Sequence, residues 1–162
     1  MAVNTKRVTG RRTLRFSSYD EMLADVRALA QGSTRQLGNW SLGQICAHLA
    51  TGMNSCIDGP AFSPNWIIRL VGPFLKKRVL TRGLTPGFQL PKNAVAFLPP
   101  ETSAAEGLAK LEKSVARVER DPTREPHIVF GKMTRDEWNE FLLRHAEMHL
   151  SFIVPELRSM KS

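Results

Sequence analysis

The sequence predicts an all-α fold, a bundle of four helices with a long proline-rich crossover between the second and the third. Four stretches begin with a helix-capping signal and continue with apolar residues at the 3.6-residue helical period. About forty residues join the second stretch to the third, which suits a bundle whose second and third helices run parallel. The third observation is a set of histidines that meet only if the second and fourth helices are antiparallel.

Length and composition indicate one globular domain with a basic surface. The chain has 162 residues, of which 42% are hydrophobic and 23% charged. We assign residues 1–16 to a basic N-terminal arm and residues 17–158 to the single domain. Lys and Arg outnumber Asp and Glu by 23 to 15. This charge permits contact with nucleic acid, anionic lipid or a small anionic ligand, but no nucleic-acid module accompanies it, so a nucleic-acid partner is the least favoured.

The first two helices have clear start and stop signals. Ser18 opens the first by a capping box with the acidic residue three positions later, and Gly32 ends it. A short extended arm, "RTLRF", is expected just before it. Ser41 and Gln44 form the capping box of the second helix, which should end near Asp58, before a Gly-Pro pair.

The last two helices are predicted by the same signals. Ser103 opens the third, and an Asp-Pro pair that ends in Pro122 stops it. The fourth repeats the signature of the second, with Thr134 and Glu137 as the capping box, and its apolar period continues to Pro155.

The crossover carries one more predicted helix. Residues 65–80 form a short amphipathic segment that we expect to pack on the bundle, with Lys76, Lys77 and Arg78 facing outward. Its apolar run is too short to span a membrane and contains Arg69 and Pro73, so no membrane partner is expected.

The two cysteines are predicted to be free thiols. Cys46 and Cys56 are ten residues apart in one expected helix. That spacing is about 15 Å, whereas a disulfide tolerates roughly 4.4–6.8 Å between Cα atoms. Free thiols fit a reducing compartment, and the polar, basic first residues lack the apolar segment of a signal peptide, so we expect a cytoplasmic protein.

Two helices place histidines on their apolar faces. In "RHAEMHLSF", His149 lies about 40° from His145 around the helix, on the apolar stripe. Glu147 falls on the opposite face, which excludes the metalloprotease pattern in which a glutamate directly follows the first histidine. His48 faces inward on the second helix, whereas Cys46 faces away and is a poor fourth ligand.

The depths of these histidines match only in an antiparallel pair of helices. His48 lies about 10 Å into its helix and His149 about 9 Å from the end of its own. The alternative is that each is a core histidine bonded to a carbonyl, which is the commoner role of a lone apolar-face histidine. Two neighbouring imidazoles would then need separate partners. We therefore predict that His48, His145 and His149 share one metal ion.

Several phrases of the sequence resemble a known family. "NWSLGQICAHL", followed after a long connection by a tryptophan and "RHAEMHL", resembles the DinB/YfiT-like metalloenzyme superfamily. "RTLRF", "GFQLP" and "PHIVFGKMTRDEW" resemble one branch of it, catalogued as a domain of unknown function. The resemblance covers roughly residues 10–155.

The resemblance implies a fold, a metal site and a class of chemistry. It implies an up-down-down-up order of the four helices and a divalent metal ion, such as zinc, nickel or iron, on the three histidines. Homodimers are common among such proteins. Characterised members include transferases and isomerases that use a low-molecular-weight thiol, namely mycothiol, bacillithiol or glutathione.

Three ligands leave coordination positions open, which is typical of a catalytic metal site. We therefore predict a metal-dependent transferase, isomerase or hydrolase that activates a thiol or water against a small-molecule substrate. A non-catalytic or stress-related metal-binding bundle is the alternative, and a nucleic-acid-binding protein the third. Residues near the site that are expected to shape the pocket or bind the cofactor are Ser41, Gln44, Phe88, Lys92 and Phe97. His127 belongs to a loop at the opposite end of the bundle and is not expected to bind the metal.

Overall fold

The protein is mostly helical, with one small sheet. The computed structural model describes residues 2–59, 66–87 and 98–156. These residues form a short 3-10 helix, five α-helices and two strands: η1 (Thr5–Arg7), α1 (Tyr19–Gln31), β1 (Thr34–Gln36), α2 (Leu42–Asp58), α3 (Trp66–Arg82), α4 (Ala104–Arg120), α5 (Arg135–Leu150) and β2 (Ile153–Pro155). The prediction of a mainly helical fold is confirmed, and the sheet is an addition to it.

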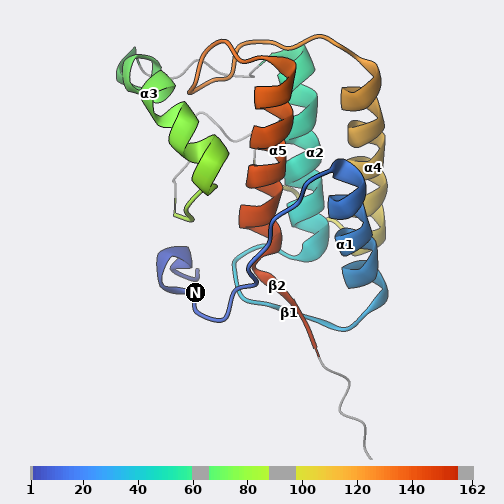
Figure 1. Cartoon of the computed structure of the whole chain (residues 1–162). Helices are drawn as coiled ribbons and strands as arrows, with labels where there is room; N and C mark the ends of the chain where they lie inside the picture. Colours follow the sequence, from blue (N-terminus) through green and yellow to red (C-terminus); the bar gives the residue numbers. More distant parts are fainter. Residues whose placement is uncertain (1, 60–65, 88–97, 157–162) are drawn as a thin grey trace, which may run out of the picture.

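Four of the helices enclose the core. Helices α1, α2, α4 and α5 lie side by side, and α3 lies outside this group, next to α5 (Figure 1). α2 packs on α4 and α5, and α1 also contacts both of these helices. The largest fully buried side chains come from these four helices and the segment after α5, and include Met22, Leu49, Met53, Leu111, Leu142 and Ile153.

The predicted helix starts are confirmed. The side chains that cap α1, α2, α4 and α5 are Ser18, Ser41, Ser103 and Thr134. In α2 and α5 both halves of the capping box are present, which satisfies two otherwise unpaired backbone N–H groups in each helix. In α1 the carboxylate of Glu21 instead accepts hydrogen bonds from the backbone and hydroxyl of Ser17.

The last predicted helix ends earlier than its apolar period suggests. α5 ends at Leu150, and the following residues form β2 instead of continuing the helix to Pro155. β2 pairs antiparallel with β1, with Ile153 opposite Gln36. The side chain of Ile153 is buried, so the apolar residues beyond Leu150 fill the core from an extended segment.

The predicted crossover helix exists as α3, and one part of its expected orientation is wrong. Lys77 and Arg78 are exposed as predicted. Lys76 does not face outward, because its Nζ atom lies 2.7 Å from a carboxylate oxygen of Glu137 on α5. α3 is thereby held against α5 by an ion pair. No helix in the described ranges is long and apolar enough to cross a membrane.

Both cysteines are free, as predicted, and both are buried. Cys46 lies where α2 meets α4, because a Cβ atom added at Gly107 of α4 would come within 3.0 Å of the Cβ of Cys46. Burial raises the pKa of Cys46 to about 12 and also raises that of Cys56. Neither thiol is therefore poised to act as a thiolate near neutral pH.

Gly43 on α2 is required for the close contact with α4. A Cβ atom there would overlap the carbonyl oxygens of Thr102 and Ser103. We expect Gly43→Ala to lower the free energy of unfolding by about 2–3 kcal/mol, because the overlapped atoms are backbone and must move. Urea denaturation of the full chain measures this loss.

Gly52→Ala on the same helix is the matched control. Its Cβ atom would lie 3.6 Å from the nearest atom of His145, an ordinary contact. Because alanine has a higher helix propensity than glycine, the free energy of unfolding should stay the same or rise by up to about 1 kcal/mol. Equal losses in Gly43→Ala and Gly52→Ala would contradict the close-approach explanation.

Candidate metal centre

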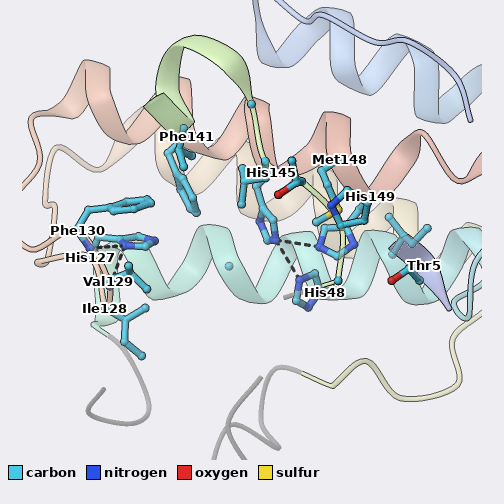
Figure 2. A pocket seen from close by; sticks show the side chains of 18 of the residues that line it. Thr5, His48, His127, Ile128, Val129, Phe130, Phe141, His145, Met148 and His149 are labelled. Carbon is cyan, nitrogen blue, oxygen red and sulfur yellow. Dashed lines mark hydrogen bonds between the residues drawn. The ribbon is translucent and has the colours of Figure 1, made fainter. Parts of the chain in front are cut away.

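Three histidines from two helices converge on one point. Nε2 of His145 lies 3.2 Å from Nε2 of His48 and 3.0 Å from Nε2 of His149. One ligand nitrogen from each of the three side chains lies within 4.8 Å of the other two. Figure 2 shows the rings of His145 and His149 from α5 turned toward that of His48 from α2. The structure thus brings together the three residues that the sequence singled out.

The two helices reach this arrangement because they run in opposite directions. Trp40, directly before the cap of α2, stacks on His149 in the last turn of α5, with ring centroids 5.3 Å apart. At the other end of α2, the carbonyl of Cys56 accepts a hydrogen bond from the N–H of Glu125, ahead of α5. This antiparallel pairing places the imidazoles of the two helices at one level.

Aromatic rings surround the histidines and help to fix their orientation. The ring of Phe141 stacks on His145, with centroids 5.7 Å apart and an interplanar angle of 14°. Trp40 also contacts His48, with centroids 4.8 Å apart. These contacts restrict ring rotation, so the Nε2 atoms are held in place before any ligand binds.

Burial keeps the imidazoles of His145 and His149 in their neutral form. The pKa of His145 lies well below its ordinary value, chiefly because desolvation penalises the imidazolium and also because of His48 and His127. Desolvation likewise lowers the pKa of His149, with smaller effects from His145, His48 and Arg11. The neutral imidazole is the form that binds metal ions.

The two printed separations between these nitrogens, from His145 to His48 and from His145 to His149, fit a shared divalent cation. Imidazole nitrogens bind zinc at about 2.0–2.1 Å, so two ligands at tetrahedral or right angles are about 2.9–3.4 Å apart. The observed separations of 3.2 and 3.0 Å lie in this range. Nε2 of a neutral imidazole offers either one proton or one lone pair, and Nε2 of His145 faces two other nitrogens, so a shared cation suits the cluster better than hydrogen bonds alone.

The histidines line a large cavity with mainly apolar walls. Its volume is about 970 Å3, and it extends along α2 and α5 from Thr5 near the N-terminus to Phe130 (Figure 2). Leu75 and Val79 of α3 form part of the wall. Among the described residues that line it, Arg78 is the only one with a permanent charge, and none is an aspartate or glutamate. The cavity gives a small molecule access to the histidines.

Two of the predicted cofactor-binding residues, Ser41 and Gln44, do not line the cavity. Ser41 and Gln44 are engaged in the capping box of α2, and the side-chain amide of Gln44 also donates a hydrogen bond to Glu101. Neither of them is among the residues that line the cavity. Lys92 falls outside the described residues, as do the other two pocket positions predicted nearby, Phe88 and Phe97.

His127 is the functional candidate that the sequence interpretation missed. We expected its loop to lie at the far end of the bundle, away from the site, but His127 lines the same cavity as the three histidines. It is not a member of the group of potential ligands formed by those three. Its Nδ1 atom accepts hydrogen bonds from the N–H groups of Val129 and Phe130, both at 3.1 Å. The sequence did contain a signal for this: the residues after His127 in "HIVFG" are apolar, which is typical of a loop that packs on the core. In the structure this loop is a turn that ends at Gly131, with a φ of 70°, and pairs it with His127.

The partly buried imidazole of His127 predicts a measurable acid sensitivity. Burial lowers its pKa to about 4, below the unfolded value of 6.5. The unfolded chain therefore binds the proton first, and stability falls as the pH drops from about 6.5 to 4, by about 3 kcal/mol in all. His127→Asn keeps an acceptor for the two N–H groups but does not titrate. Urea denaturation of metal-free protein measures the free energy of unfolding at pH 7 and pH 4. We expect it to fall less in His127→Asn than in the wild type, and equal losses in both proteins would contradict the lowered pKa of His127 as the cause.

One comparison with known proteins identifies a family. The model of the family described as "Protein of unknown function (DUF1569)" matches residues 8–156. Neither a curated protein nor a solved structure matches the chain. The match includes the three converging histidines, His127 and the whole described fold from the residue after η1 onward. The chain belongs to the DUF1569 family.

Proposed function

We propose that His48, His145 and His149 hold one divalent metal ion, and that the chain is a metal-dependent enzyme acting with a small thiol or water. The observation that carries this proposal is the convergence of three Nε2 atoms, at 3.2 and 3.0 Å, from two antiparallel helices. All-nitrogen ligation suits zinc, nickel or iron. The proposed reaction class is a transferase, isomerase or hydrolase.

The chain's own residues prepare the site for this chemistry. The three imidazoles would present nitrogen lone pairs to the ion and would leave coordination positions open. When bound, the ion supplies Lewis acidity, which lowers the pKa of a coordinated water or thiol. Trp40 and Phe141 cover His149 and His145 and limit water around the rings. The apolar cavity beside them admits an organic substrate.

The proposed fold is the up-down-down-up four-helix bundle of the DinB/YfiT-like superfamily. Contacts between α2 and α4 support a parallel pair: Gly43 and Gly107 meet near the two starts, and Asn54 donates to Ser114 farther along both helices. α2 and α5 are antiparallel, as this order requires. Mycothiol, bacillithiol or glutathione is the proposed thiol, on the strength of the same resemblance.

Elemental analysis of the purified full chain tests the metal site. We expect about one divalent ion for each chain after loading and desalting. His149→Ala should lose it, because a first ligand is removed, whereas His127→Asn should keep it as a matched control at a partly buried histidine of the same cavity. Wild-type protein that takes up no zinc, nickel or iron would end the proposal.

A non-catalytic metal-binding role is the second candidate. It is favoured by the lack of any carboxylate among the described residues of the cavity wall, since such a group often serves as general base. Loaded protein assayed with each thiol and a panel of electrophilic substrates separates the two functions. Turnover that disappears with chelation or in His149→Ala supports the enzyme, and stable metal binding without turnover supports the alternative.

A homodimer is also proposed from the resemblance. One chain has a mass of 18.2 kDa. Light scattering after size exclusion is expected to give twice this mass, and a value equal to one chain would contradict the dimer.

A further inference from the structure

The tautomer of His127 is fixed by the backbone around it. Nδ1 accepts hydrogen bonds from the N–H groups of both Val129 and Phe130, so it carries no proton. In the neutral imidazole the proton must then reside on Nε2. The ring is held between Phe130, which stacks on it at 4.5 Å, and Phe141, which meets it edge-on at 4.5 Å. His127 is therefore a rigid donor with one defined direction.

Among the described residues this donor has no acceptor. No described residue accepts a hydrogen bond from Nε2 of His127, although the side chain lines the cavity. Nor is Nε2 among the occluded side-chain atoms without a partner, all of which belong to arginines, so it can be reached from the cavity. A donor that opens into a mainly apolar cavity and has no partner among the described residues is available to a ligand or water.

The rest of the cavity defines which ligand suits this donor. The described walls carry no carboxylate, so a cationic ligand would be desolvated without a counter-charge. The apolar walls favour a mainly apolar body, and the polar hydrogen on Nε2 of His127 favours an acceptor in the ligand. The best match is an uncharged or anionic apolar molecule with a carbonyl-type oxygen.

We propose that His127 positions the substrate: its Nε2–H donates a hydrogen bond to a carbonyl-type oxygen of an apolar small molecule that lies in the cavity. The phenyl ring of Phe141 lies between His127 and His145. Its centroid is 4.5 Å from that of His127 and 5.7 Å from that of His145. A molecule of two fused rings bound at His127 therefore reaches toward the three-histidine cluster. Only this last step, contact with the metal, rests on the proposed function.

A pair of probes that differ by one carbonyl tests the hydrogen bond. 2-Acetylnaphthalene and 2-ethylnaphthalene compete with the fluorescent probe 1-anilinonaphthalene-8-sulfonate on chelator-treated full-length protein. We expect the acetyl compound to bind about threefold to tenfold more tightly, the value of one hydrogen bond. His127→Asn keeps an acceptor for the two backbone N–H groups but lacks the Nε2–H donor, so it should bind both compounds equally. Ile128→Val shortens an apolar side chain of the same cavity wall and should keep the preference for the acetyl compound.

Three results would overturn the proposed hydrogen bond from His127. Equal affinity of the two probes for wild-type protein overturns the proposal without any variant, and so does a preference that survives in His127→Asn. Nitrogen-15 NMR of histidine-labelled protein should show Nδ1 unprotonated at His127, and the opposite tautomer would also overturn it. Because metal is absent from these measurements, failure here leaves the metal site standing, and failure of the metal site leaves this result standing.

Discussion

Replacing His145 by alanine is expected to abolish tight binding of divalent metal and the stabilisation that comes with it. Nε2 of His145 is the atom closest to both other ligands, at 3.2 Å from His48 and 3.0 Å from His149. Changing a residue that merely supports a ligand costs about 10- to 100-fold in affinity, so removing a ligand should cost more. At a free zinc concentration of 1,000 times the wild-type Kd, the metal adds about 4 kcal/mol to the stability of the wild type, and we expect almost none of this in the variant.

Thermal or urea denaturation with and without zinc measures the effect. The quantity to compare is the increment caused by zinc, because His145→Ala also leaves a void that lowers stability without metal. His127→Asn provides the control and should retain the full increment. An undiminished increment in His145→Ala would show that zinc binds elsewhere.

Arg144→Met is expected to lower the free energy of unfolding by about 3–5 kcal/mol, the usual cost of breaking a buried ion pair. The side chains of Arg144 and Glu147 are 2% and 9% exposed, and their charged atoms approach to 3.0 Å. The pair also fixes the N-terminal arm, because Arg144 donates to the carbonyl of Phe16 and Glu147 accepts from its N–H, both at 2.6 Å. Without Arg144, the carboxylate of Glu147 stays buried and uncompensated.

Two further variants decide whether this explanation holds. Adding Glu147→Gln to Arg144→Met removes the uncompensated charge and should recover part of the loss. Arg15→Met removes an ion pair to Glu140 in which both side chains are well exposed, and should cost less than about 1 kcal/mol. Equal losses in Arg144→Met and Arg15→Met by urea denaturation would contradict the role of burial.

Local signals in the sequence predicted the helices and the inward direction of the histidines. Ser41 with Gln44, and Thr134 with Glu137, fix where α2 and α5 begin. Helical periodicity then sets which side chains face the core. These features depend on a few neighbouring residues, which is why they can be predicted from sequence.

Features that depend on distant contacts were not predictable in the same way. Pairing of β1 with β2 joins two three-residue strands, too short to show an alternating pattern. The ion pair of Lys76 with Glu137 depends on where α3 docks, which the amphipathic pattern does not specify. The position of His127 in the cavity wall was not predictable for a similar reason, because the path of its loop depends on tertiary packing.

X-ray absorption at the zinc edge of the loaded full-length protein tests the shared-cation hypothesis most directly. We predict three imidazole nitrogens at about 2.0–2.1 Å from zinc, no sulfur ligand, and a smaller imidazole contribution in His149→Ala. Sulfur at about 2.3 Å, or a spectrum that is identical in wild type and His149→Ala, would contradict a metal centre built from His48, His145 and His149.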